Sequence, residues 1–225
     1  MFRKRSSSWL SYSLFTVVVV CLAVGIASAQ TQFEPADTYQ VTYYSNAVSG
    51  ENHVNDATVH IVNPGTSLTK INANGKPLNG NLCAMIYVLN DDQQEEECCS
   101  CELTPDSEDT LSVNTDLLSS PINPAIFTKD GVIKIVSAAY NTKNPADFCR
   151  PDLPNIVPTA GLRAWVTHIQ AQPGPPATAT TFPETEEEFA SAPLSDFELQ
   201  NLENQCSAIF TSGSGVGECK CEDNN

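Results

Sequence analysis

Hydrophobic residues along the chain recur in short runs that are either wholly apolar or alternate with polar residues. The longest apolar run outside the N-terminus covers residues 82–89, and both alternate sets of its side chains are hydrophobic. This pattern is typical of a strand that is buried on both faces. Because the turn sequence Asn90-Asp91-Asp92 follows it, we expect residues 97–103 to return as an antiparallel partner.

Period-two alternation predicts further strands. Ala57, Val59 and Ile61 alternate with Thr58 and His60, which indicates a half-buried strand over 57–62. The other expected strands cover residues 40–44, 110–114, 131–138 and 162–170, the first of them at a sheet edge. Short strands at this spacing are typical of an antiparallel β-sandwich. We therefore predict a mainly β fold, Ig-like in the loose sense, with a sandwich domain at 30–171.

The segments between these strands are rich in turn residues. Residues 66–81 are polar and contain two Asn-Gly pairs, so we expect a hairpin or loop there. Residues 141–160 contain four prolines and Cys149. So many breakers predict an irregular loop, held down by a bridge from Cys149.

The chemistry of the chain changes after residue 171. Residues 172–183 form a Pro/Ala/Thr-rich linker. Two sequences beyond it, Thr185-x-x-Glu188 and Ser195-x-x-Glu198, match the capping box that begins helices. The second is followed by hydrophobic residues on a single helical face: Leu199, Leu202, Cys206, Ile209 and Phe210. We expect residues 184–225 to form a helical C-terminal lobe that packs on the sandwich.

The first 29 residues have the organisation of a signal peptide. Basic residues at 3–5 precede an apolar region at 14–27, and Ala27-Ser28-Ala29 is a small-residue cleavage site. The apolar region is shorter than the roughly 20 residues that a membrane span needs. We predict an exported chain that begins at Gln30 and has no membrane span, located in the extracellular space, the periplasm or the cell envelope.

Eight cysteines remain once Cys21 is removed with the signal peptide. They are Cys83, Cys98, Cys99, Cys101, Cys149, Cys206, Cys219 and Cys221. An even set in an exported protein predicts disulfides, although the sequence does not choose among the pairings. The neighbours Cys98 and Cys99 should not pair with each other, because adjacent Cα atoms lie about 3.8 Å apart and a bridge needs roughly 4.4–6.8 Å. We expect at least one bridge from the central strands to the C-terminal tail.

Two other roles for the cysteines are open. Cys98-x-x-Cys101 together with Cys219-x-Cys221 could form a four-thiolate metal site. Alternatively, Cys98 and Cys101 could be a redox pair, which would require them to open a helix after a strand. The Glu-rich flank and the export signal favour structural disulfides over both roles.

Charge limits the partners. The chain has 11 basic and 27 acidic residues, a net charge of −16, and cleavage after residue 29 makes it more acidic still. Such a surface repels nucleic acid and anionic lipid. We therefore expect no nucleic-acid partner. A protein or glycan partner that binds the surface, or self-assembly, is compatible with this charge.

A few residues are weak candidates for metal ligands. His60 and His168 lie on expected strands and could flank copper or zinc. Acidic residues in expected turns could gather around Ca²⁺: Asp91, Asp92, Glu95, Glu96 and Glu97, and separately Asp106, Glu108 and Asp109. Neither acidic group matches a known calcium-binding repeat. We expect no cofactor, with Ca²⁺ as the alternative.

No nucleophile elbow, zinc-protease motif, phosphate loop or dinucleotide fingerprint occurs in the sequence. The hypothesis that follows is a non-catalytic protein with a structural, adhesive or binding role. A secreted metal-dependent or carbohydrate-active enzyme is one alternative, which convergence of His60, His168 and acidic residues in a pocket would favour. A subunit of an extracellular assembly is another, which an unpaired edge strand would favour.

Several motifs resemble those of a group of uncharacterised secreted bacterial proteins. They are NLCAMIYV at 81–88, ECCSC at 97–101, GLRAW at 161–165, and the LE-x-x-C and C-x-C elements between Leu202 and Cys221. The resemblance covers most of the chain after the signal peptide. It implies export and a shared cysteine scaffold, and it transfers no activity and no catalytic residues.

Overall fold

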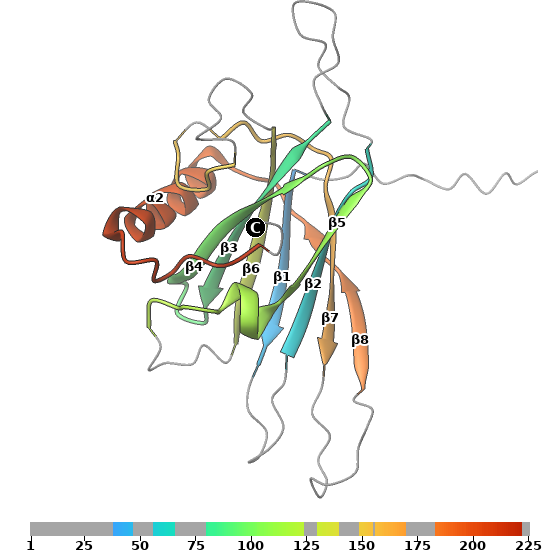
Figure 1. Cartoon of the computed structure of the whole chain (residues 1–225), viewed down its shortest axis with the longest axis horizontal. Helices are drawn as coiled ribbons and strands as arrows, with labels where there is room; N and C mark the ends of the chain where they lie inside the picture. Colours follow the sequence, from blue (N-terminus) through green and yellow to red (C-terminus); the bar gives the residue numbers. More distant parts are fainter. Residues whose placement is uncertain are drawn as a thin grey trace, which may run out of the picture. The chain divides into compact units, whose positions relative to one another are not determined.

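Nine strands in two antiparallel sheets make up about half of the chain that the computed structural model describes (Figure 1). The described residues are 38–46, 56–65, 80–123, 130–139, 149–154, 156–169 and 183–221. The expected signal peptide, almost all of the loop expected at 66–81 and residues 172–182 of the expected linker lie outside them.

The first sheet has five strands in the order β4-β3-β6-β1-β9. Their bounds are β4 Glu95–Leu103, β3 Leu82–Asn90, β6 Asp130–Ala139, β1 Tyr39–Ser45 and β9 Ala190–Ser191. The second sheet has the order β5-β2-β7-β8. Its strands are β5 Ser107–Ser112, β2 Asp56–Asn63, β7 Arg163–Ile169 and β8 Glu184–Glu188. The predicted mainly β fold of two antiparallel sheets is confirmed.

A hydrophobic core fills the space between the two sheets. Val59 and Ile61 of β2 and Ile86 and Val88 of β3 are fully buried in it. These residues belong to the alternate sets that the sequence assigns to one face of each strand. All nine residues of β3 are buried, because its other face carries a second core. The expectation of a strand covered on both sides is confirmed.

The second core lies between the five-stranded sheet and the helix α2 (Asp196–Ser212). Tyr87 and Leu89 of β3 contribute to it from the sheet, and Leu202 and Ile209 contribute from the helix. Figure 1 shows α2 on the side of β4 and β3, away from β7 and β8. The described part of the chain therefore has three layers, with the five-stranded sheet in the middle.

Both ends of α2 follow local sequence signals. The Ser195 side chain accepts a hydrogen bond from the Glu198 backbone N–H at 3.1 Å, which satisfies one of the free donors of the first turn. Gly213 ends the helix with φ of 63°, a left-handed conformation that glycine adopts without steric strain. The helix predicted from the second capping box is confirmed.

The helix predicted from the first capping box, Thr185-x-x-Glu188, is wrong. Residues 184–188 form the exposed edge strand β8, paired with β7, and β9 follows at 190–191. The helical part of the C-terminal lobe therefore starts at Asp196, and residues 184–191 belong to the two sheets. The pairing of β8 with Trp165, Val166 and Thr167 on β7 decides its structure, because local helix signals are weak against ladder hydrogen bonds.

Two other predictions need correction. The strand expected at 40–44 is not a free edge, because Gln40 and Val41 pair with β9. The strand expected at 110–114 ends at Ser112, and the π-helical turn η1 (Val113–Leu117) follows. In that turn Val113 and Leu117 are buried in the core between the sheets.

Four disulfides join the eight cysteines. The pairs are Cys83–Cys149, Cys98–Cys206, Cys99–Cys219 and Cys101–Cys221, with sequence separations of 66, 108, 120 and 120 residues. Three of them run from β4 to α2 or to the segment beyond it. Neither the four-thiolate metal site nor a Cys98–Cys101 redox pair forms, since Cys98 and Cys101 lie on one strand and have other partners.

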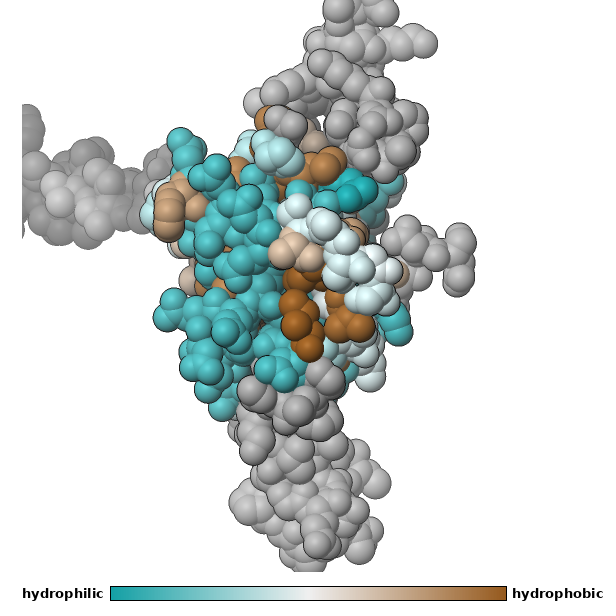
Figure 2. Space-filling model, turned by 90° about the vertical axis from the view of Figure 1, so that its left-hand side faces the viewer, coloured by the Kyte–Doolittle hydropathy of each residue, from teal (hydrophilic) through white to brown (hydrophobic). Residues whose placement is uncertain are grey.

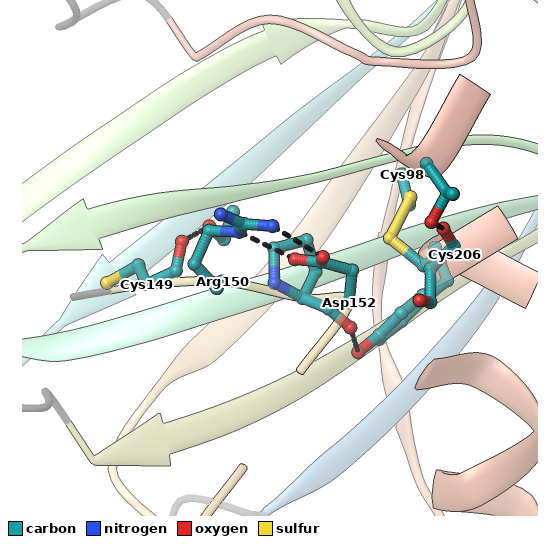
Figure 3. A network of polar contacts seen from close by, with 10 residues as sticks. Cys98, Cys149, Arg150, Asp152 and Cys206 are labelled. Carbon is teal, nitrogen blue, oxygen red and sulfur yellow. Dashed lines mark hydrogen bonds and ion pairs between the residues drawn. A yellow bond between two sulfur atoms is a disulfide. The ribbon is translucent and has the colours of Figure 1, made fainter. Parts of the chain in front are cut away.

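Polar contacts hold residues 149–154 against β4 and α2 (Figure 3). Arg150 forms two hydrogen bonds with Asp152, and its guanidinium lies 5.3 Å from the centre of the Phe210 ring. The Cys149 carbonyl accepts a hydrogen bond from the Ser100 hydroxyl. The Cys83–Cys149 bridge and these contacts anchor the described end of the loop expected at 141–160.

Among the described residues, no helix has the length and hydrophobicity needed to cross a membrane.

Candidate functional site

Three consecutive glutamates at the start of β4 are buried. The exposed fractions of Glu95, Glu96 and Glu97 are 5%, 1% and 0%. Glutamate is almost never fully buried without a partner. The burial of three glutamates in a row therefore needs an explanation from the groups around them. The prediction that these acids lie in a turn as candidate calcium ligands is wrong about their structure: they lie on the strand β4, and each contacts a different part of the protein.

A β-bulge makes the side chains of these three glutamates point in different directions. Val88 on β3 pairs with Glu97, but the next residue, Leu89, pairs with Glu95, so Glu96 is an extra residue in β4. A bulge bends its strand and redirects the side chains around it. As a result, Glu95 lies beside the Cys98–Cys206 disulfide below α2, whereas Glu96 and Glu97 face the segment that follows η1.

Both carboxyl oxygens of Glu96 accept a hydrogen bond. One of its carboxylate oxygens accepts a hydrogen bond from the Asn90 side-chain amide at 2.7 Å, and the other accepts from the Asn123 backbone N–H at 3.1 Å. Its own carbonyl accepts from the Ile122 N–H at 3.2 Å. Glu96 therefore fastens residues 122–123 to the strand.

Only one of the two carboxyl oxygens of Glu97 accepts a hydrogen bond. One oxygen accepts a hydrogen bond from the Ser120 backbone N–H, and the other has no hydrogen-bond partner. Burial raises the pKa of this carboxyl from 4.5 to about 7, against the opposing effect of the Ser120 hydrogen bond. Glu97 therefore titrates near neutral pH.

Glu95 has no partner for either carboxyl oxygen. Burial raises its pKa from 4.5 to about 9, and the attraction of Lys134 offsets only part of that effect. Lys134 itself forms an ion pair with Glu198 at 2.6 Å. Glu95 is therefore a neutral carboxylic acid at pH 7, with one donor and several acceptor positions unused.

A pocket of about 560 Å³ lies between the start of β4, residues 122–123, α2 and the segment 212–216, and Glu95 is among its lining residues. Its acidic lining residues are Glu95 and Glu96. Its neutral polar lining residues are Gln94, Asn123, Gln205, Ser212 and Ser214. Its apolar lining residues are Ile122, Ala208, Ile209 and Val216. The volume is in the range of small-molecule sites.

The face of the molecule that carries α2 is mainly hydrophilic, with a small hydrophobic patch near its middle (Figure 2). Two of the residues that line the pocket are exposed hydrophobic side chains, Ile122 at 48% and Val216 at 39%. The pocket lining therefore combines exposed apolar side chains with acidic and neutral polar residues.

Covalent and backbone links hold the pocket walls. Cys98–Cys206 joins β4 to α2, and Cys99–Cys219 joins β4 to the segment after α2. Gly217, which lies between Cys206 and Cys219 in the sequence, adds two backbone hydrogen bonds. Its carbonyl accepts from the Cys98 N–H at 2.8 Å, and its N–H donates to the Ser120 carbonyl at 2.7 Å. These links fix the walls independently of any ligand.

The donor set near Glu95 does not suit a resident divalent metal. A carboxylate oxygen of Glu95 and the sulfurs of Cys98 and Cys206 lie within 4.8 Å of one another. However, the two sulfurs are bonded to each other, and metals bind the thiolate form. Glu95 alone remains, which is fewer ligands than Zn²⁺ or Ca²⁺ takes in proteins.

The two candidate histidines do not converge. His60 lies on the outer face of the four-stranded sheet, stacked on Trp165 with ring centres 5.3 Å apart and 3.0 Å from a Glu108 oxygen. His168 is buried on the inner face, stacked on Tyr43 at 4.7 Å. Burial lowers the pKa of His168. Neither histidine lines the pocket.

Asp91 and Asp92 are exposed in the turn between β3 and β4 and do not line the pocket. The pocket residues on α2 and after it are absent from the candidates that the sequence provides. Only the run Glu95-Glu96-Glu97 next to Cys98 pointed toward this region. Its burial depends on the bulge and on α2, which the sequence pattern does not reveal.

Comparison of the chain with models of known protein families, with curated proteins and with solved structures finds no match.

Proposed function

We propose that this chain is an exported, disulfide-stabilised protein of the cell envelope or extracellular space that acts by binding rather than by catalysis. The observation that carries the proposal is that disulfides fasten both α2 and the segment after it, two walls of the Glu95 pocket, to β4. A site whose walls are already fixed loses little conformational entropy when a ligand binds.

The bridges also support an oxidising location. Disulfides persist in extracellular and periplasmic compartments and are rare in the reducing cytosol. All eight cysteines after residue 29 are paired, and the first 29 residues have the organisation of a signal peptide. The resemblance to secreted bacterial proteins supports the same location, and we include membership of that group in the proposal.

The pocket chemistry favours binding. A hydrolytic site needs a nucleophile in contact with a base. The Ser212 and Ser214 hydroxyls lie 3.0 Å from each other, and Ser212 donates to the Ile209 carbonyl. His60 and His168, the bases of the enzyme alternative, lie on opposite faces of the other sheet. Among the described lining residues, the geometry therefore supplies recognition groups and brings no histidine base to a nucleophile.

Assembly by strand addition receives less support. The edge of β4 that faces away from β3 is not open at Cys98, because Cys98 pairs with Glu218 of the C-terminal segment. The edge strand β8 carries Glu184, Glu186, Glu187 and Glu188. Charged residues on an edge oppose the pairing of sheets between molecules.

Expression of the whole chain with its first 29 residues in a bacterial host tests the location. We expect an exported product that begins at Gln30 by N-terminal sequencing. Peptide mapping without reduction should give four linked pairs that match the structure. A folded product with free thiols, or one retained in the cytosol, would contradict the proposal.

A panel of generic hydrolase substrates tests the binding role: chromogenic esters, glycosides and phosphate esters incubated with the exported protein. We expect no turnover above that of a Glu95→Gln variant. Turnover that the Glu95→Gln change abolishes would show a catalytic carboxyl and overturn the assignment.

A further inference from the structure

A buried carboxyl group lies beside one of the four disulfides. A carboxyl oxygen of Glu95 and the sulfurs of Cys98 and Cys206 lie within 4.8 Å of one another. Both cysteines are fully buried, and neither carboxyl oxygen of Glu95 has a hydrogen-bond partner. Among the described residues, no other disulfide forms such a cluster with an acidic or histidine side chain. The surroundings of this bridge, which Figure 3 shows between β4 and α2, therefore differ from those of the other three.

We propose that Cys98–Cys206 is a redox-active disulfide, cleaved by a dithiol reductant, and that Glu95 is the proton donor to the sulfur that leaves. This inference goes beyond the binding role, because it gives the protein a site of covalent modification. Cleavage begins when a thiolate attacks one sulfur of a disulfide and the other sulfur departs with the bonding electron pair. In a buried bridge the charge on the departing sulfur is strongly disfavoured. A neutral acid next to the bridge removes this obstacle by giving the sulfur a proton.

The protonation state of Glu95 suits this role. Burial raises its pKa to about 9, against the opposing attraction of Lys134, so the carboxyl group carries its proton at pH 7. Apolar surroundings also raise the pKa of a cysteine thiol above its usual value of about 8.5. Because the two pKa values are then similar, a proton moves from the acid to the sulfur with little cost in free energy. The separation in the closed bridge is longer than a hydrogen bond, and such contacts often shorten only during the reaction.

The other titratable groups of this region come from each element packed around the bridge. They are Lys134 on β6, Tyr87 on β3, Glu203 on α2 and Asp152 in the loop beside them. Lys134 forms an ion pair with Glu198 at 2.6 Å, and the Tyr87 hydroxyl donates to the Pro151 carbonyl at 3.0 Å. Asp152 is held by Arg150. Of the described acidic and histidine side chains, Glu95 is the one that clusters with both sulfurs.

The reaction balances with the dithiol as its only co-reactant. One reductant thiol loses its proton to water, and its thiolate forms a bond to one cysteine sulfur. The bond between the two cysteine sulfurs breaks, and the other cysteine sulfur takes the proton of Glu95. The second reductant sulfur, also as a thiolate, then displaces the remaining cysteine sulfur, which is protonated by the same route. The two protons that the reductant released restore Glu95. Two electrons pass to the bridge, and the products are two protein thiols and a reductant disulfide.

Reduction of this bridge frees α2 while the segment after it stays attached. Cys98–Cys206 joins β4 to the helix, whereas Cys99–Cys219 and Cys101–Cys221 join β4 to the segment beyond. Because the helix covers the buried sulfurs, a reductant reaches them when α2 moves away from β4. Once the bridge is cleaved, only noncovalent contacts return the helix to the sheet. The bridge therefore acts as a redox-sensitive switch for one wall of the pocket.

Timed reduction of the full exported chain with dithiothreitol tests the proposal. Samples are quenched with N-ethylmaleimide, and peptide mapping gives the initial cleavage rate of each disulfide. The rate for Cys98–Cys206 is divided by the rate for Cys99–Cys219 in the same sample, which cancels the ionisation of the reductant. We expect Glu95→Gln to lower this ratio about tenfold or more at pH 7. The amide keeps the size and neutrality of the protonated acid, but it has no acidic proton to give.

Glu102→Gln is the matched control. Glu102 lies on the same strand, is exposed, and accepts a hydrogen bond from Asn81. We expect this variant to have the same ratio of rates as the wild type. The wild-type ratio should stay constant up to about pH 8 and fall as Glu95 loses its proton near pH 9. Because this pH profile needs no substitution, it decides even if Glu95→Gln does not form the four disulfides.

Amide hydrogen exchange in residues 196–212 separates proton transfer from opening of the helix. We expect the wild type and Glu95→Gln to exchange at equal rates there at pH 7. Three results would overturn the proposal: an unchanged ratio in Glu95→Gln, a wild-type ratio that stays constant from pH 7 to pH 10, or a lowered ratio accompanied by slower exchange in α2. The last result would show that Glu95 acts on the position of the helix and not as the proton donor.

Discussion

At the scale of single residues, identical side chains acquire different properties from their hydrogen-bond partners. Each carboxyl oxygen of Glu96 accepts a hydrogen bond, one oxygen of Glu97 accepts one, and neither oxygen of Glu95 does. The pKa rises to about 7 for Glu97 and to about 9 for Glu95, because burial disfavours the charged form. Ionisation of either group therefore opposes folding.

Stability should decrease with rising pH. A carboxyl whose pKa is higher in the folded than in the unfolded state retains its proton more strongly when folded, so its contribution is complete below 4.5 and is lost as pH rises. The loss ends near pH 7 for Glu97 and near pH 9 for Glu95. Thermal unfolding of the wild type should show a falling Tm over this range.

The two variants separate these contributions. Glu95→Gln should remove the fall in Tm between pH 7 and 9, whereas Glu97→Gln should leave that part and remove part of the fall below pH 7. His168 acts in the opposite direction only below about pH 6.5, since burial lowers its pKa. A Tm for Glu95→Gln that falls as steeply as that of the wild type above pH 7 would contradict this account.

Gly217 is required for a close contact as well as for its backbone conformation. Its φ is 87°, and a Cβ there would lie 2.7 Å from Ile209 and 3.0 Å from Ile122. Gly215 has a similar φ of 72° with open space around it. Gly215→Ala should lower the free energy of unfolding by about 1–2 kcal/mol through backbone strain alone. Gly217→Ala should lower it by about 1–3 kcal/mol more, as measured by urea unfolding; equal effects would exclude the contact.

At the scale of elements, β4 organises the pocket side of the molecule. It pairs with β3, forms three of the four disulfides and carries the bulge at Glu96. The helix α2 depends on these links, because an isolated helix of 17 residues is marginal in water. Its capped start and its buried face at Leu202, Cys206 and Ile209 complete the attachment.

Replacing Cys98 and Cys206 together by alanine should detach α2 preferentially. Loss of a native disulfide typically costs about 2–5 kcal/mol, and this bridge is the direct link between β4 and α2. We expect amide hydrogen exchange in residues 196–212 to become faster than in the strands. The double variant of Cys83 and Cys149 is the control, because its bridge anchors a loop and not the helix; faster exchange in α2 to the same degree in both would contradict a specific role.

At the scale of the whole molecule, two hydrophobic cores join the three layers of the described residues. The apolar side chains of β3 support one core against β2 and another against α2. The acidic residues of β8 lie at an exposed edge, where water screens their repulsion. Bridges that span up to 120 residues restrict the unfolded chain.

Features that depend on neighbours along the chain could be predicted from the sequence. Alternation at Ala57, Val59 and Ile61 located β2, the two apolar sets of residues 82–89 located β3, and Ser195-x-x-Glu198 located the start of α2. These patterns are readable because the side-chain period of a strand or helix and the geometry of a helix cap are local.

The sequence did not reveal the pairing of the cysteines, the strand at Glu184–Glu188 or the burial of Glu95, Glu96 and Glu97. Each of these depends on residues far away in the sequence: β7 for the strand, Asn123 and Ser120 for two of the glutamates, and α2 for the third. Thr185-x-x-Glu188 and Ser195-x-x-Glu198 carry the same local signal, yet one pairs with a strand and the other begins a helix. Long-range contacts decide between the two structures. A local helix preference contributes only a few tenths of a kcal/mol per residue, and about 1 kcal/mol at an N-cap, and the combined energy of the long-range contacts exceeds this.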